Sequence, residues 1–166
     1  VPFNESWGQF DTPAVVKMTR ELDPTRLVNP ASGGNFDFSS GAEGYGDIID
    51  VHHYPCPAMN FFDRKFVNVL GEYGGIGLPI EGHTWNIDRK WGYGGNKKDS
   101  EEVMTIYEQY LEMLKVFVST GCAAAVYTQT TDVEGEVNGL MTYDRKVIKV
   151  DIPRIAKGNK SVIESM

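Results

Sequence analysis

Two glutamates, Glu5 and Glu72, each stand at the end of a short apolar run. The runs are residues 1–5 and 66–72. An apolar run that stops abruptly at polar groups is typical of a buried strand in a parallel sheet. Functional groups of parallel α/β proteins collect at the carboxyl ends of strands, so we expect both carboxylates on one rim. Such a pair can supply a proton donor and a nucleophile or base.

The elements that must position these glutamates alternate between strand patterns and helix or loop patterns. Strand-like runs occupy residues 1–5, 27–29, 48–54, 66–72 and 122–130. Asp11-Thr12-Pro13 predicts the start of one helix, since a capping residue precedes a proline in the first turn. Asp99 with Glu102 resembles a capping box, and Gly121 is a natural stop for the second helix. Parallel strands need crossover connections, so this order indicates an α/β fold.

The composition limits the classes of partner. The chain has 166 residues and a formal net charge of -7, which offers no cationic face to nucleic acid or to a membrane surface. No stretch approaches the roughly 20 apolar residues of a spanning helix. Cys56 and Cys122 fit no metal-ligand spacing, so two free thiols are expected. The compartment stays open, with the bacterial cytoplasm or periplasm as the expectation.

The motifs around the two glutamates resemble those of a known enzyme family. Pro-Phe-Asn-Glu-Ser-Trp-Gly surrounds Glu5, and Gly-Glu-Tyr-Gly-Gly surrounds Glu72. Together with Asp-x-His-x-Tyr at residues 50–54 and Thr-Gln-Thr-Thr-Asp at 128–132, they resemble glycoside hydrolase family 2, which contains β-galactosidases, β-glucuronidases and β-mannosidases. An Asn-Glu dipeptide alone is weak, but a strand-terminal Gly-Glu at the right strand interval makes the resemblance specific.

The resemblance implies a fold. In that family the acid/base ends the fourth strand of a (β/α)₈ TIM barrel and the nucleophile ends the seventh. Residues 1–166 would then form one domain, a partial barrel of strands four to eight with their helices and loops, and the amino-terminal half would be missing. We therefore expect self-association through exposed half-barrel edges and weak or no turnover by the isolated chain.

The resemblance also implies an activity. It makes Glu5 the acid/base and Glu72 the covalent nucleophile of a retaining enzyme that hydrolyses terminal β-glycosidic bonds. Asn4 would bind the sugar 2-hydroxyl, and Tyr54 would hold an oxygen of the nucleophile. The expected reaction is β-galactosidase-like, with a carbohydrate substrate and no cofactor.

The histidine pair does not indicate a metal site. Adjacent strand residues point to opposite faces, so His52 and His53 cannot both bind one ion without a bend. We expect a hydrogen-bonded His52 that faces the pocket, a packed His53, and no metal.

Aromatic and amide side chains are the remaining candidates for substrate contact. Trp7 and Trp85 could stack on a sugar face, although packing against a loop is at least as frequent for each. At the last strand, many family members carry a tryptophan under the sugar, whereas this chain has Tyr127 or the nearby Gln129. This departure leaves the identity of the sugar open.

Two other functions stay open. One is a carbohydrate-binding fragment that keeps the pocket without turnover. The other is a non-hydrolytic enzyme that uses Glu72 as a base for proton abstraction, but no cofactor or metal cluster is apparent to stabilise an enolate.

Overall fold

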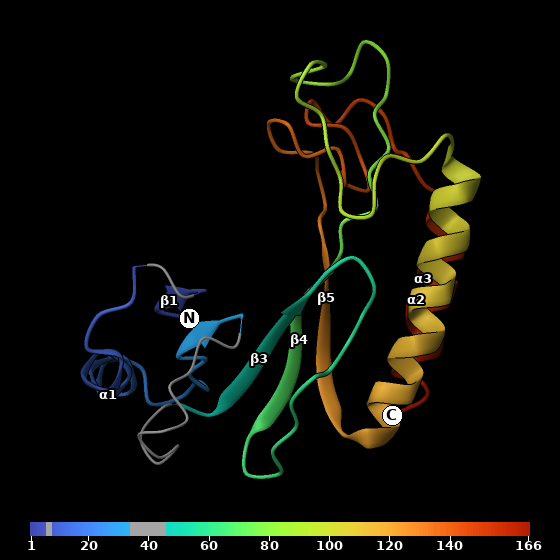
Figure 1. Ribbon diagram of the computed structural model, residues 1–166. Coiled ribbons are helices and arrows are strands. Elements are labelled where there is room, and N and C mark those ends of the chain that lie inside the picture. The colour runs from blue at the N-terminus through green and yellow to red at the C-terminus, as the bar shows by residue number, and fades with distance from the viewer. Residues whose placement is uncertain (6–7, 34–45) are drawn as a thin grey trace.

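The computed structural model describes residues 1–5, 8–33 and 46–166. Its elements, in chain order, are β1 (Phe3–Asn4), α1 (Thr12–Leu22), β2 (Ala31–Ser32), β3 (Ile48–His53), β4 (Val67–Gly74), α2 (Ser100–Thr120), β5 (Cys122–Thr128) and α3 (Ile152–Ile163). In Figure 1, α2 and α3 run along one side of the β3–β5 sheet, while β1 and α1 lie beyond β3.

The five strands form two small parallel sheets. β1 pairs with β2, and β3, β4 and β5 form a separate sheet in that order. With three helices, this α/β arrangement is too small and sparse for strands four to eight of a TIM barrel, so that prediction was wrong. The α/β class is confirmed.

The first two predicted strands fail for local reasons. The first run gives only two paired residues, because Glu5 has φ 52°, in the left-handed region that ends an extended strand. In the second run, the Val28 N–H donates to the carboxylate Oδ2 of Asp47, 2.7 Å away, in place of a strand partner. Neither run is long enough to carry a continuous sheet across to β3.

β4 carries a bulge that sets the position of Glu72. Val51 pairs with Leu70, but the next pair is His52 with Glu72, so Gly71 is an extra residue in β4. A Cβ atom on Gly71 would overlap the carboxylate of Asp50. Glycine at this position therefore permits the close approach of β3 that brings Glu72 opposite His52.

The two longer helices cover one face of the β3–β5 sheet. Asp99 caps α2 by accepting a hydrogen bond from the Glu102 N–H, and Gly121 ends it with φ 105°, as predicted. The capping role predicted for Asp11 in α1 was wrong, because Asp11 has φ 39° and makes no side-chain cap bond. The main core lies between this sheet and the helices; it includes Leu70, Tyr73, Met104, Tyr107, Leu111, Leu114 and Ile155.

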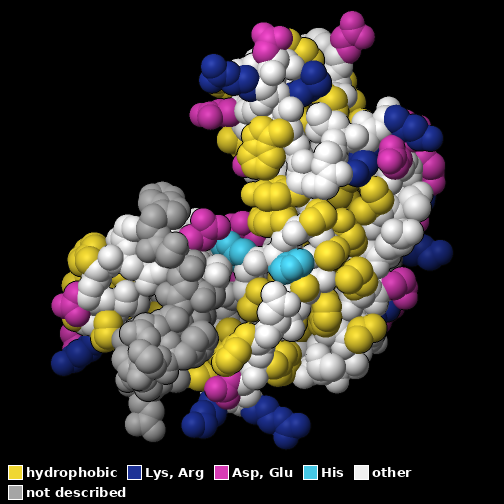
Figure 2. All heavy atoms as spheres, viewed as in Figure 1, with side chains coloured by type: hydrophobic (Ala, Val, Ile, Leu, Met, Phe, Trp, Pro, Cys, Tyr) yellow, Lys and Arg dark blue, Asp and Glu magenta, His cyan; other side chains and the backbone are white. Residues whose placement is uncertain are grey.

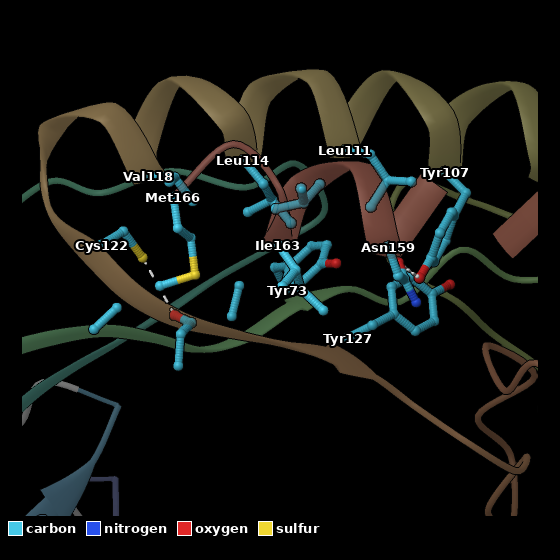
Figure 3. Close-up of a pocket in the computed structure, with 14 residues that line it drawn as sticks. Tyr73, Tyr107, Leu111, Leu114, Val118, Cys122, Tyr127, Asn159, Ile163 and Met166 are labelled. Atoms are coloured by element: carbon cyan, nitrogen blue, oxygen red, sulfur yellow. Dashed lines mark hydrogen bonds between the residues drawn. The ribbon is translucent and has the colours of Figure 1, made fainter. Parts of the chain in front are cut away.

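A pocket of about 360 Å³ lies between β5 and the two helices. Figure 3 shows Leu114 and Val118 of α2 and Ile163 of α3 lining it opposite β5. The wall is mainly apolar, and Cys122 at its edge is a free thiol, as is Cys56. None of the helices described is long and apolar enough to cross a membrane.

Residues 75–98 and 129–149 form irregular loops above the carboxyl end of β5, which we call the loop cap (Figure 1). Lys149 joins these loops. Its Nζ atom donates to the carbonyl oxygens of Leu78 and Val137, 2.9 Å from each. The same atom lies 2.6 Å from Oδ1 of Asp132, and the two side chains are 1% and 2% exposed. A buried ion pair therefore holds the cap together.

Candidate active site

Three side chains from separate elements meet at the carboxyl ends of the strands. Glu5 follows β1, His52 lies in β3, and Glu72 lies in β4. The Nδ1 atom of His52 is 3.2 Å from Oε1 of Glu5 and 3.4 Å from Oε2 of Glu72. The imidazole is 7% exposed, whereas the glutamate side chains are 44% and 32% exposed. The histidine therefore forms the floor of a carboxylate pair that reaches solvent.

Figure 2 shows acidic side chains and a histidine at a hollow between the part that carries α1 and the loop cap. The facing atoms of Glu5, His52 and Glu72 all lie within 4.8 Å of one another. A single small group can therefore touch both carboxylates.

The hydrogen bonds behind His52 determine where its protons lie. The Ser32 hydroxyl donates to Oδ2 of Asp50 at 2.9 Å, so its lone pairs face the Nε2 atom of His52 at 2.8 Å. Since Ser32 can only accept there, Nε2 carries a hydrogen. Nδ1 then faces the carboxylates of Glu5 and Glu72.

Asp50 supports this arrangement from a buried position. It is 3% exposed, and its Oδ2 atom also accepts a hydrogen bond from the Asn29 amide at 2.6 Å. Its Oδ1 atom lies 3.9 Å from Nε2 of His52. Asp50 thus fixes the orientation of the Ser32 hydroxyl that contacts Nε2 of His52.

Tyr54 fixes one oxygen of Glu72. Its hydroxyl donates to Oε2 of Glu72 at 2.6 Å. Burial, followed by this hydrogen bond, raises the pKa of Tyr54 well above its ordinary value, so the phenol stays a donor. Among the described residues, nothing hydrogen-bonds the other oxygen, Oε1. That oxygen is the one with which Glu72 can attack a ligand.

The same cluster is also a possible ligand set for a divalent cation. One histidine nitrogen and two carboxylate oxygens within 4.8 Å can bind such an ion. Such an ion would lie between the imidazole and the two carboxylates.

A row of aromatic rings leads from Tyr54 into the loop cap. Tyr54 and Tyr93 stack with ring centroids 3.8 Å apart and an interplanar angle of 9°. Trp91 meets Tyr93 edge-on at 5.1 Å and is 43% exposed. The row ends in a tryptophan face that a sugar ring could cover.

A polar rim lies beside Trp91. Gln129, which follows β5, donates through Nε2 to Oε2 of Glu136 at 3.0 Å and to Oδ1 of Asn138 at 2.8 Å. The backbones of Trp91 and Glu136 are joined by an isolated parallel bridge. Desolvation raises the pKa of Tyr93, and the negative charges of Glu136, Glu72 and Glu5 raise it further. Tyr93 therefore lies within the field of all three carboxylates.

A scan of protein-family models finds no match to the chain, and a search of curated proteins finds no significant sequence match. The resemblance to glycoside hydrolase family 2 therefore rests on the motif residues alone.

The structure brings some of the predicted site residues together and leaves others apart. Glu5, His52, Tyr54 and Glu72 form the cluster, and Gln129 lies on the polar rim. Asn4 is exposed in β1, next to Glu5. The ring of His53 packs instead on the loop after β3, with Nδ1 2.7 Å from the carbonyl oxygen of Cys56.

Two predicted aromatic contacts, Tyr127 and Trp85, are not found at the cluster. Tyr127 points from β5 toward the helices, where it packs against Tyr73 and Tyr107, so its ring belongs to the core. Trp85 is 65% exposed and pairs with Tyr143 on the loop cap. Trp7 lies outside the described residues.

Sequence reasoning missed Glu136 and Asn138. Both stand in residues 132–138, which carry turn-forming residues and no periodic pattern. The only signal was their closeness in sequence to Gln129, and that does not specify which side chains face one another.

Proposed function

We propose that this chain is a retaining β-glycosidase, with Glu72 as the nucleophile and Glu5 as the acid/base. The observation that carries the proposal is the cluster in which Tyr54 and His52 both contact Oε2 of Glu72 while Glu5 lies across the same gap. Retaining glycosidases use two carboxyl groups about 5–5.5 Å apart. Here the facing carboxylate oxygens of Glu5 and Glu72 lie within 4.8 Å of each other, close enough to act on one sugar ring.

In the first step, Oε1 of Glu72 attacks the anomeric carbon while the bond from that carbon to the leaving oxygen breaks. Glu5 gives its proton to that oxygen. The aglycone leaves as an alcohol, and the sugar remains joined to Glu72 as an ester. In the second step, the Glu5 carboxylate takes a proton from water, whose oxygen attacks the anomeric carbon and releases Glu72. Two inversions retain the configuration.

His52 and Tyr54 position the reacting groups. Nδ1 of His52 lies 3.2 Å from Glu5 and 3.4 Å from Glu72, so the imidazole lies between the two carboxylates and holds them at one gap. The Tyr54 hydroxyl holds Oε2 of Glu72 and directs Oε1 toward the ligand. Hydrogen bonds of this kind are most effective when they are in place before the reaction.

The substrate we propose is a terminal β-hexoside, of which a β-galactoside is the first choice on the motif resemblance. Trp91 would cover one face of the ring, and Asn4 would reach the 2-hydroxyl from beside Glu5. A carbohydrate-binding fragment without turnover is the second candidate, favoured by the 44% exposure of Glu5. An exposed acid is less able to keep its proton away from water.

The test is covalent capture of Glu72. A 2-deoxy-2-fluoro-β-galactosyl fluoride should add one sugar to the chain, and peptide mass spectrometry should place it on Glu72. The Glu5→Ala variant should still be labelled, because fluoride leaves without a proton, and azide should then speed release of the sugar. EDTA should not change the rate of labelling. Absence of label with gluco and galacto reagents alike would remove the proposal, and loss of labelling in EDTA would favour a metal site.

We also propose that the chain self-associates through β5. In the part of the chain that the structure describes, β5 pairs only with β4, and residues 123–126 are exposed. The apolar pocket of about 360 Å³ lies directly beside this edge. Unpaired strand edges next to apolar surface favour pairing between chains.

A further inference from the structure

The hydrogen bonds between Glu136, Gln129 and Asn138 leave only acceptors free on Glu136 and on the Gln129 side chain. A carboxylate can only accept, so the amide nitrogen of Gln129 must face Oε2 of Glu136. The second hydrogen of that nitrogen goes to Asn138, which is fully buried and fixes the amide in this orientation. The free groups are then Oε1 of Gln129 and Oε1 of Glu136, and both are acceptors.

This rim belongs to the same site as the carboxylate cluster. Glu72 is bound by Tyr54, the Tyr54 ring stacks on Tyr93, and Tyr93 contacts Trp91. Trp91 donates its backbone N–H to the carbonyl oxygen of Gly135 and accepts from the N–H of Val137, on either side of Glu136. A ring that covers Trp91 therefore meets the rim at its edge.

The rim and the cluster carry three glutamates, Glu5, Glu72 and Glu136. Within the described ranges, no lysine or arginine forms an ion pair with Glu5, Glu72 or Glu136. A ligand group placed there must donate hydrogen bonds, and a negatively charged group would meet unpaired acceptors at short range. A ligand that leaves polar groups of the site without hydrogen-bond partners binds more weakly, so such groups make the site selective between ligands.

We infer that Glu136 is a specificity-determining residue that accepts a hydrogen bond from a hydroxyl or ammonium group of the sugar and excludes sugars with a carboxylate in that position. The inference rests on the proposed function in taking a sugar as the ligand. It deepens that function by naming the substrate class as neutral or amino hexosides, and it excludes uronides.

The test is a binding series that needs no turnover. Calorimetry at pH 6 would compare three ligands that differ only at C6: methyl β-glucoside, its 6-amino-6-deoxy analogue, which is protonated there, and methyl β-glucuronide. The expected order of affinity is amino sugar, then neutral sugar, then uronide, with about tenfold between the first and the last, the effect of about 1.4 kcal/mol. Glu136→Gln should reduce the differences in affinity between the three sugars, because the new amide both donates and accepts hydrogen bonds.

The matched control is Glu134→Gln, which removes the same charge from an exposed residue two positions away. It should leave the order unchanged. The inference is overturned if the glucuronide binds as well as the amino sugar, if none of the three binds, or if Glu136→Gln keeps the wild-type order. Failed capture of Glu72 with this order intact would remove hydrolysis and keep the subsite.

Discussion

At the scale of the residue, the orientation of His52 in the candidate site depends on one hydroxyl hydrogen, that of Ser32. Ser32 has one hydrogen and gives it to Asp50, which makes Nε2 of His52 a donor. Nδ1 is left to face Glu5 and Glu72. A single hydroxyl hydrogen thus determines which edge of the imidazole faces the carboxylate pair.

Tyr54→Phe should slow capture of Glu72 by the fluoro-sugar about 100-fold, the usual cost of removing one pre-positioned donor. The phenyl ring keeps the stack on Tyr93, but Oε2 of Glu72 loses its 2.6 Å hydrogen bond. The measurement is the rate of label addition by mass spectrometry. Tyr143→Phe, on the loop cap, is the control and should react at the wild-type rate. Equal rates for both variants would show that the Tyr54 hydroxyl has no such role.

The residues at this scale were only partly predictable. Glu5, Glu72 and Tyr54 could be found because each stands at or just beyond the end of a strand-like run. Glu136 could not, because its place depends on two loops meeting through a backbone bridge with Trp91. Contacts of this kind leave no period in the sequence.

At the scale of the element, the bulge in β4 is the feature that aligns the site. If the pairing of β3 with β4 continued in register without the bulge, His52 would pair with Gly71, and Glu72 would lie opposite His53. Side chains alternate along a strand, so a shift of one residue turns a group to the other face. The Gly-Glu motif therefore has a structural meaning: the glycine makes room for Asp50, and the glutamate gains its partner.

Lys149→Met should lower the free energy of unfolding by about 3–5 kcal/mol, because it leaves Asp132 charged and buried without its partner. Desolvation already lowers the pKa of Lys149 and raises the pKa of Asp132, and their mutual contact opposes both shifts. Urea unfolding at pH 7 measures the change. Adding Asp132→Asn should recover part of the loss.

The control for this prediction is Lys146→Met, since the Lys146 side chain is 73% exposed. Its effect should stay within about 0.5 kcal/mol. If the two lysine variants unfold alike, the buried pair does not stabilise the loop cap.

The longer elements were predictable and the short ones were not. The α2 boundaries could be predicted from a capping residue and a terminal glycine. The strands β3, β4 and β5 could be predicted because each lies in a strand-like run of six residues or more. β1 and β2 have two residues each, and local backbone geometry decides such strands. The barrel prediction failed at this point, because it needed both short runs to be full members of one sheet.

At the scale of the whole molecule, the edge of β5 is the surface most open to another chain. Its exposed residues, 123–126, are small or apolar and carry no charge. Natural edge strands are commonly protected by a lysine or a proline, and this one has neither.

Val126→Lys should therefore shift the chain toward the monomer. Val126 is 54% exposed, so the substitution costs little stability, while the added charge opposes strand pairing. Analytical ultracentrifugation over a range of concentrations should show association for the wild type and less for the variant. The control is Val116→Lys, at a 60% exposed position on α2. A wild type that stays monomeric throughout would rule out this interface.

The groups proposed to react and the groups proposed to recognise the sugar lie on different parts of the molecule. The carboxylate cluster is carried by the ends of strands, whereas Trp91 and Glu136 are carried by the loop cap that Lys149 fastens from within. A cap held by an internal anchor can exchange its outward residues without disturbing what lies beneath. On the proposed function, a change of glycan would require substitutions in these two loops alone, while the carboxylate cluster stayed the same.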